Sequence, residues 1–297
     1  MKRILVTGKN GQLGFELQRS LSVCGEVIAV GHSDCDLSDT KSVRELIRTI
    51  KPDIIINPAA YTAVDRAERE PALADAVNHL AIKAMGEEAE LLRIPVVHYS
   101  TDYVYNGTKK TPYIETDATD PQCVYGKTKR DGEIALAQSC SRHLIFRTSW
   151  VLGAFGNNFA KTMLRLAASK SSLNVVADQY GAPTTAALLA DATAHVVARF
   201  CSPDDFESIS GIYHIAASGK TNWHEYAQFI INFAHENGES LTTLVENVMP
   251  ISTEAYPTPA TRPANSCLDL SKFQNSFNLV LPDWKIGVRH VLQQVLS

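Results

Sequence analysis

The sequence has no apolar stretch of the ~18 residues that a membrane-spanning helix needs, so we expect no transmembrane segment. Its first residues are basic and then apolar up to Val6, like the start of a signal peptide. Thr7 and Gly8 end that run well short of the ~7–15 apolar residues of a secretory leader. Blocks of like charge are also missing, although the formal net charge is -4. Nucleic acid and membrane surfaces are therefore not expected partners, and an anionic ligand must be bound locally.

The cysteines show neither CxxC pairs nor metal-type spacing. We therefore interpret them as reduced, mostly buried small hydrophobic residues, which predicts a cytoplasmic protein without a metal site of its own. The six are Cys24, Cys35, Cys123, Cys140, Cys201 and Cys267.

Strand-length apolar runs alternate with helix-length amphipathic segments through the first half of the 297 residues. This alternation is typical of βαβ units and predicts an α/β fold of the Rossmann type, a doubly wound parallel sheet. The expected strands are Ile4–Thr7, Val27–Val30, Ile54–Asn57, Val96–Ser100 and Leu144–Thr148. The expected helices are Gln12–Ser22, Lys41–Ile50, Ala72–Leu92 and Tyr125–Gln138, the second capped by Asp39 or Thr40.

From about Phe155 the alternation weakens. We expect residues 1–154 to form a dinucleotide-binding domain and residues 155–297 to form mainly a smaller substrate-binding cap, with some segments returning to the first domain. The prolines of segment 256–263 require an extended or turned chain. Helices are expected at Asn158–Ala168, Ala186–Phe200 and Trp223–His235, and short strands at Leu173–Val176 and Gly211–Ile215.

A glycine-rich turn, Gly8 to Gly14 with Gly11 between them, follows the first strand and opens a helix. Glycine lets the backbone bend sharply and approach a pyrophosphate, and the N–H groups of the helix start attract its charge. The alternative is a merely tight turn, but the strand–turn–helix context favours dinucleotide binding.

The end of the second strand influences the choice between NADH and NADPH. NAD-selective folds place there an acid that holds the ribose 2′-OH, and this sequence has Gly31. With Lys9 and His32 as candidate partners of the 2′-phosphate, we expect the protein to accept NADPH and to use it as well as or in preference to NADH. The alternative is that Gly31 only ends the strand and the site does not discriminate between NADH and NADPH.

Tyr125 and Lys129 are four residues apart on a predicted helix, so they share one face. A nearby cation would lower the pKa of the phenol from ~10 and make Tyr125 a usable acid. As hydride reaches a carbonyl carbon, Tyr125 can protonate the oxygen while Thr101 donates a hydrogen bond and Lys129 holds the nicotinamide ribose. A YxxxK pattern also arises by chance, but here it follows the glycine turn and a strand that ends in Ser100-Thr101.

With these motifs the chain resembles the extended short-chain dehydrogenase/reductases over nearly its whole length, most closely those acting on dTDP-linked keto sugars. The resemblance implies NAD(P)H-dependent reduction of the 4-keto group of dTDP-4-dehydro-β-L-rhamnose, the last step of dTDP-L-rhamnose synthesis. It rests on the segments Val6–Gly14, Asn57–Asp65, Ser100–Tyr105, Val124–Lys129, Arg147–Trp150, Asn157–Phe159, Asp178–Thr184 and Arg262–Pro263.

The resemblance also implies contacts for individual residues. Gly11, Gln12 and Leu13 would line the pyrophosphate, Asp36 and Leu37 would meet the adenine, and Ala60 to Thr62 would flank the ribose and nicotinamide. The implied cofactor set is Gly8, Gly11, Gln12, Leu13, Gly14, Asp36, Leu37, Ala59, Ala60, Tyr61, Thr62, Tyr99, Tyr125 and Lys129. The implied substrate set is Thr101, Asp102, Trp150, Asn158 and Arg262.

Simpler interpretations stand beside some of these assignments. Trp150 could be a core aromatic residue, and 181–184 could be only a loop. Asp65 and Arg66 are expected to form a charge pair at a helix start rather than to bind a ligand. Arg262 suits a diphosphate because a guanidinium matches phosphate oxygens bidentately, or else it is a surface residue.

The resemblance includes one departure. Members of this family can dimerise around Mg²⁺ held by glutamates, and Glu16 matches the first of these, whereas the later positions are Ala187 and Gln294. Mg²⁺ prefers carboxylate oxygens, so a homodimer of this chain is not expected to be bridged by the metal.

Two other functions fit the same fold. An epimerase or 4,6-dehydratase would keep its NAD bound, but Thr101-Asp102 is followed by Tyr103, without the Asp-Glu couple of a dehydratase. A non-catalytic regulatory subunit is the second alternative, and the presence of Thr101, Tyr125 and Lys129 argues against it.

Overall fold

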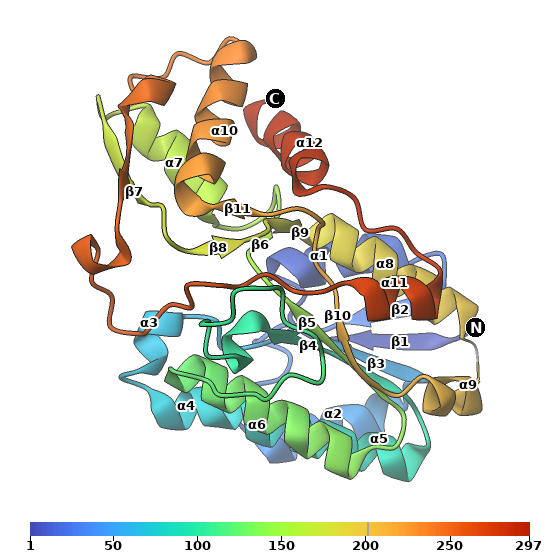
Figure 1. Cartoon of the computed structure of the whole chain (residues 1–297). Helices are drawn as coiled ribbons and strands as arrows, with labels where there is room; N and C mark the ends of the chain where they lie inside the picture. The colour runs from blue at the N-terminus through green and yellow to red at the C-terminus, as the bar shows by residue number, and fades with distance from the viewer. Residues whose placement is uncertain (201) are drawn as a thin grey trace.

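The computed structural model describes residues 1–200 and 202–297. Six parallel strands form its central sheet in the order β10-β5-β4-β3-β1-β2 (Figure 1). The order reverses between β1 and β3, and in such sheets ligands bind at the carboxyl ends of the strands where the order reverses. The strands are β1 (Arg3–Val6), β2 (Glu26–Ala29), β3 (Ile54–Asn57), β4 (Val96–Thr101), β5 (His143–Thr148) and β10 (Gly211–His214).

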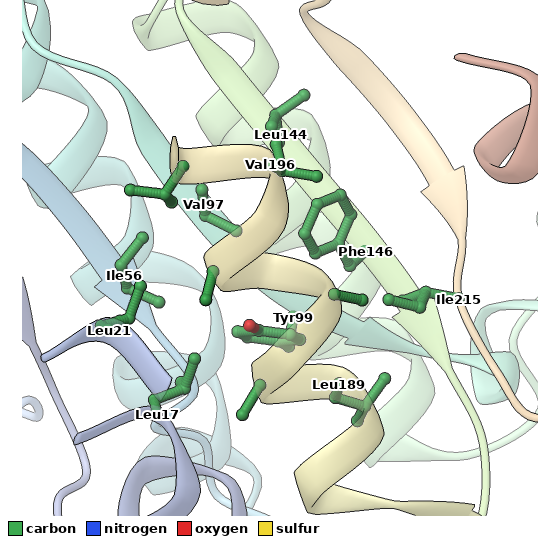
Figure 2. Close-up of a cluster of buried hydrophobic side chains, with 14 of the residues drawn as sticks. Leu17, Leu21, Ile56, Val97, Tyr99, Leu144, Phe146, Leu189, Val196 and Ile215 are labelled. Atoms are coloured by element: carbon green, nitrogen blue, oxygen red, sulfur yellow. The ribbon is translucent and has the colours of Figure 1, made fainter. Parts of the chain in front are cut away.

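Helices cover both faces of this sheet. On one face, Leu17 of α1 and Leu189 of α8 pack against Ile56, Val97 and other strand residues in one apolar cluster (Figure 2). Helices α2, α5 and α6 form a second cluster on the opposite face. The predicted doubly wound α/β fold is therefore confirmed. The helices are α1 (Gln12–Leu21), α2 (Thr40–Ile50), α5 (Ala81–Leu92), α6 (Val124–Ser139), α8 (Ala186–Arg199) and α11 (Ser271–Phe277).

The region predicted as one helix over Ala72–Leu92 is three pieces. A π-helical turn, η1 (Ala76–Leu80), separates α4 (Pro71–Asp75) from α5, after the short α3 (Val64–Ala67). The wider turn carries Asn78, whose side chain bonds the backbone of Tyr61 in both directions, at 2.8 and 3.1 Å. The predicted cap of α2 is correct, because the Asp39 carboxylate accepts from the Lys41 N–H at 3.0 Å.

The second half of the chain contributes to two places. Helix α8, the short α9 (Pro203–Ser208), strand β10 and α11 lie on the central sheet, whereas a separate apolar cluster unites α7, α10 and α12 above it. The upper region contains α7 (Phe159–Ala167), α10 (Trp223–Glu236), α12 (Trp284–Leu296), the pair β7 (Leu173–Val176) and β12 (Val248–Ile251), and the short pairs β6 (Val151–Leu152) with β9 (Thr184–Thr185) and β8 (Tyr180–Gly181) with β11 (Thr221–Asn222).

Single 3₁₀ turns complete the chain: η2 (Asp102–Val104), η3 (Val245–Asn247) and η4 (Thr253–Ala255). The proline segment after η4 is non-helical, as its sequence requires. Cys35, Cys123, Cys140 and Cys267 are buried free thiols and Cys24 is partly buried, whereas Cys201 lies outside the described residues. In the described part of the chain, no helix combines the length and the apolar character needed to cross a bilayer.

A buried ion pair fixes α6 to the sheet. The guanidinium of Arg147, on β5, binds Glu133 of α6 through two hydrogen bonds of 2.9 and 2.6 Å, and both side chains are 3% exposed. Arg147 also donates to the Tyr105 hydroxyl, which in turn contacts His214 Nε2 of β10 at 2.7 Å. Because Glu133 lies one turn after Lys129, this network sets the position of the helix that carries Tyr125 and Lys129.

We expect Arg147→Met to lower the free energy of unfolding by about 3–5 kcal/mol, because it leaves the Glu133 carboxylate buried without its cation. Urea denaturation measures the change. Arg66→Met is the control, since it breaks the exposed Arg66–Glu70 pair at 2.9 Å, which solvent screens, and should lower the stability far less. Equal losses in the two variants would contradict the importance assigned to the buried pair.

Candidate active site

The turn between β1 and α1 has the geometry expected of a phosphate-binding loop. Gly8 has a φ of +62°, and a Cβ on Gly14 would overlap the Gly8 carbonyl oxygen. Gly11 is the N-cap of α1 and has no side chain that could occupy the first N–H groups of the helix. These N–H groups and the helix dipole together favour an anion. The side chain of Leu13 packs into the sheet core, so Leu13 can meet a ligand through its backbone.

Beside this turn lies a cavity of about 270 Å³. Six residues of the predicted cofactor set line it: Gly8, Asp36, Leu37, Ala59, Ala60 and Tyr61, together with Thr7, Val30, Gly31, His32, Cys35, Leu73 and Val77. Its position, at the carboxyl ends of β1 and β3, agrees with the sheet topology. Thr62 is exposed next to Tyr61.

An acid at the end of β2 was missed by the sequence analysis. The chain after Gly31 turns back, so that the carboxylate of Asp34 accepts from the Gly31 N–H at 2.8 Å. The same carboxylate binds the ammonium of Lys9 at 2.6 Å, so Lys9 has a partner within the protein. His32 lies 3.7 Å from Asp36. Gly31 itself provides no carboxylate, as expected, but Asp34, three residues later in sequence, brings one next to it, which the sequence analysis did not consider.

Tyr125 lies at the start of α6, and the side chain of Thr101, the last residue of β4 and the N-cap of η2, lies beside its phenol. The Thr101 hydroxyl also donates to Asp102 Oδ1 at 2.9 Å. Tyr103 packs edge-on against Tyr125, with ring centroids 5.5 Å apart. One helix start and one strand end therefore bring together Tyr125 and Thr101, predicted as catalytic, and Asp102, predicted to bind the substrate.

Asp102 is 3% exposed, and its Oδ2 atom makes no hydrogen bond to a described residue, although the side chain of Ser266 lies near enough to the carboxylate to lower its pKa. Burial raises the pKa of this carboxyl to about 6. An acid with one free oxygen, held beside the Tyr125–Thr101 pair, is suited to bind a hydroxyl of a ligand.

Lys129 is 1% exposed, and its amine reaches the Tyr99 carbonyl oxygen at 2.6 Å and His98 Nε2 at 3.0 Å. Burial lowers the pKa of Lys129 to about 7 and raises that of the Tyr125 phenol. The expected lowering of the Tyr125 pKa by Lys129 is therefore wrong for this structure, because desolvation outweighs any effect of the amine, which is engaged by His98 and Tyr99.

The ring of Tyr99 points away from Lys129. It lies in the sheet core, where its hydroxyl meets Thr193 of α8 at 2.5 Å (Figure 2). Tyr99 therefore contributes to the site through its backbone carbonyl oxygen, which accepts from Lys129.

Gln12 and Asn158 join the glycine turn to the upper region. Asn158 caps α7 by accepting from the Lys161 N–H at 3.1 Å, and its Nδ2 donates to Gln12 Oε1 at 3.0 Å. The two residues, predicted as cofactor and substrate ligands, thus bind each other.

Trp150 occupies a strained position. Its φ is +48°, its ring stacks on Trp223 with centroids 3.6 Å apart, and a Cβ on Gly181 would come within 2.7 Å of it. A positive φ is unusual for a bulky side chain, so the packing around Trp150, including the stack on Trp223, must hold it in place. Residues 181–184 are more than a loop, because β8 and β9 include part of them.

Arg262 and Asp65 form an ion pair at 2.6 Å, and Arg262 lies 3.4 Å from the Tyr103 hydroxyl. Arg66 instead binds Glu70 at 2.9 Å. The predicted pairing of Asp65 with Arg66 is therefore wrong, because the chain near residue 260 folds back over the start of α3. The ion pair places the guanidinium next to Tyr103, the neighbour of Tyr125.

The positions compared with the metal ligands of the family carry other contacts. Glu16 binds Arg19 at 3.2 Å, and Gln294 bonds to His290 at 3.0 Å. Within residues 1–200 and 202–297, no group of three His, Cys, Asp or Glu side chains could hold a metal ion.

Comparison with known proteins agrees with this geometry. A family model described as the RmlD substrate binding domain matches residues 1–297. A dTDP-4-dehydrorhamnose reductase of Salmonella typhimurium is 50% identical, over 99% of this chain and 98% of that protein. The chain belongs to the dTDP-4-dehydrorhamnose reductase family. The resemblance to reductases of dTDP-linked keto sugars is thereby confirmed.

Solved structures of the family have the same fold. The dTDP-4-dehydrorhamnose reductase of Clostridium acetobutylicum is 33% identical with a TM-score of 0.91, covering 99% of this chain and 100% of that one. The enzyme of Bacillus anthracis, solved in complex with NADP, is also 33% identical, with a TM-score of 0.89 and the same coverage.

The raised pKa of Asp102 predicts a pH-dependent cost to stability. The unfolded carboxyl ionises near its ordinary pKa of 3.8 and the folded one near 6, so the folded state binds more protons between these values and becomes less stable as the pH rises through that window. Asp102→Asn removes this titration. We expect its free energy of unfolding, relative to the parent protein, to rise by about 2–3 kcal/mol from pH 4 to pH 7. A difference that stays constant with pH would contradict the assignment.

Proposed function

We propose that the protein reduces the 4-keto group of dTDP-4-dehydro-β-L-rhamnose to the alcohol of dTDP-β-L-rhamnose, with NAD(P)H as the reductant, in the last step of dTDP-L-rhamnose synthesis. The observation that carries the proposal is the placement of Tyr125, at the start of α6, beside Thr101 at the end of β4, with the dinucleotide-type cavity at the ends of the nearby strands β1 and β3. Membership of the reductase family supplies the identity of the sugar.

Tyr125 is the proton donor in this proposal. Bound NAD(P)H supplies a hydride to the carbonyl carbon, and the carbonyl oxygen, as it gains negative charge, takes the proton of the Tyr125 hydroxyl. Thr101 stabilises that oxygen when its hydroxyl hydrogen turns from Asp102 Oδ1 to the substrate. An ammonium has three N–H bonds, and Lys129 uses two for Tyr99 and His98, which leaves the third for the nicotinamide ribose.

The substrate is held from both sides of the cleft. Asp102 would accept from a sugar hydroxyl through its free Oδ2 atom, and the ring of Trp150 would pack against the sugar. Arg262 would bind the diphosphate. Asn158 would shape the side of the cleft that the upper region forms, through its hydrogen bond to Gln12.

The domain division is part of the proposal. Residues 1–154, with the returning α8, β10 and α11, form the dinucleotide-binding domain, and the rest of residues 155–297 form the cap. A cytoplasmic location agrees with the buried free thiols, and a homodimer, if formed, would use contacts other than an Mg²⁺ bridge.

Tyr125→Phe is expected to lower kcat by about 10²–10⁴-fold or more, because it removes the general acid. The assay follows oxidation of NADPH in the presence and absence of dTDP-4-dehydrorhamnose. Tyr226→Phe is the matched control, since the Tyr226 hydroxyl is buried without a partner among the described residues and should be dispensable. Retained turnover in Tyr125→Phe would refute the donor, and a parent protein that leaves NADPH unoxidised with this sugar would refute the reaction.

The Lys9–Asp34 pair is expected to let the protein use both cofactors, because the carboxylate suits a ribose 2′-OH and the ammonium suits a 2′-phosphate. Asp34→Asn should therefore raise the ratio of kcat/KM for NADPH over NADH by about tenfold, and Lys9→Gln should lower it, since hydrogen bonds to charged groups contribute about 1.5–3 kcal/mol. His32→Gln tests whether the exposed imidazole contributes. Unchanged ratios in the first two variants would exclude the pair as the selector.

A further inference from the structure

A line of four polar side chains runs through the sheet from the cofactor cavity to Lys129. The Thr7 hydroxyl, after β1, donates to Asn57 Oδ1 at the end of β3. Asn57 Nδ2 lies 2.9 Å from His98 Nδ1 on β4, and His98 Nε2 lies 3.0 Å from the amine of Lys129 on α6. All four side chains are at most 2% exposed, and Thr7 also lines the cavity.

The surroundings of Lys129 make its charge adjustable. Glu133, one helical turn away, is the carboxylate whose field reaches Lys129, and Arg147 of β5 already holds Glu133. His98 faces the amine from β4 and stays neutral, because burial lowers its pKa well below the usual value. The balance between the neutral amine and the ammonium of Lys129 therefore depends strongly on whether His98 Nε2 and the Tyr99 carbonyl oxygen accept hydrogen bonds from it.

Two complete sets of hydrogen bonds fit these positions. In the first, Asn57 Nδ2 donates to His98 Nδ1, so the imidazole hydrogen is on Nε2 and Lys129 must accept it as a neutral amine. In the second, the ammonium of Lys129 donates to Nε2 and the imidazole hydrogen is on Nδ1. The amide of Asn57 is then turned over, so that its oxygen accepts from Nδ1 and its nitrogen donates to the Thr7 hydroxyl.

The two sets differ at the cavity. When Lys129 is neutral, the Thr7 hydroxyl donates its hydrogen to Asn57 Oδ1. When Lys129 is charged, that hydrogen is free to be donated to a ligand. An anionic dinucleotide next to Thr7 and the glycine turn therefore favours the second set, through both the donated hydrogen bond and the positive charge of Lys129.

We propose that the Thr7–Asn57–His98 line couples occupation of the cofactor cavity to the protonation of Lys129, so that binding of the dinucleotide charges the lysine that holds its ribose. Thr7, Asn57 and His98 are positioning residues in this scheme, which rests on the proposed function of the same site. The coupling is reciprocal, so a charged Lys129 also raises the affinity for the cofactor.

The test is proton uptake on cofactor binding, measured by calorimetry at about pH 8 in two buffers of different ionisation enthalpy. NADH is the probe, because it lacks the 2′-phosphate, which titrates in a similar range. At that pH Lys129 of the cofactor-free protein is mostly neutral, since its pKa is about 7. The parent protein is expected to take up a large fraction of one proton.

Thr7→Val keeps the shape of the side chain and removes the hydroxyl through which a bound ligand favours the charged set. We expect it to reduce the uptake at least twofold and to weaken NADH binding more at pH 8 than at pH 6, with Thr7→Ser restoring both. Asn57→Asp should hold Lys129 charged and abolish the uptake. Thr193→Val is the matched control, because it also loses a buried threonine hydrogen bond, to the Tyr99 hydroxyl, but lies outside the line.

The outcomes separate the two proposals. A parent protein that fails to bind NADH or to reduce the keto sugar would overturn the proposed function. A parent protein that binds and reduces, with the same proton uptake as Thr7→Val, would overturn the coupling alone. Loss of uptake in Thr193→Val as large as in Thr7→Val would also overturn it, since a general loss of packing would then be the cause.

Discussion

Lys129 carries an amine into the interior, and the polar arrangement around it follows from the cost of burying a charge there. The carboxylate nearest to it on α6, Glu133, is already held by Arg147, so a neutral imidazole and a backbone carbonyl receive the amine instead. Such partners stabilise an ammonium less than a carboxylate would. The protein thereby keeps Lys129 able to change its charge, whereas the neighbouring ion pair of Glu133 and Arg147 is permanent and holds the helix in place.

The parallel sheet explains why the site lies where it does. Strands buried on both faces leave room for polar side chains mainly at their ends, and Thr7, Asn57 and Thr101 all lie at carboxyl ends of β1, β3 and β4. The reversal of strand order between β1 and β3 leaves space for the cavity at that edge. The upper region has an apolar core of its own, and Trp150, two residues after β5, packs against that core and so lies between the two regions.

Local patterns in the sequence predicted the sheet, the glycine turn and the shared face of Tyr125 and Lys129, because each depends on neighbours within one turn or one strand. The features that were missed depend on contacts between distant segments. Asp34 reaches Gly31 only because the loop folds back, and Arg262 finds Asp65 across the whole chain. The π-helical turn at Asn78 looks like ordinary helix in sequence. Periodicity could not show that burial governs the pKa of Tyr125, since burial is a property of the assembled site.

The ion pair between Asp65 and Arg262 bears on how a ligand would leave. A guanidinium that had bound a diphosphate would become uncompensated at the moment of release, which slows departure. Here Asp65 stands within reach on α3 and can take the place of the phosphate oxygens as they withdraw. In the proposed function, Asp65 is therefore an internal counter-ion that lowers the energy difference between the loaded and the empty cleft, which favours turnover over tight retention of product.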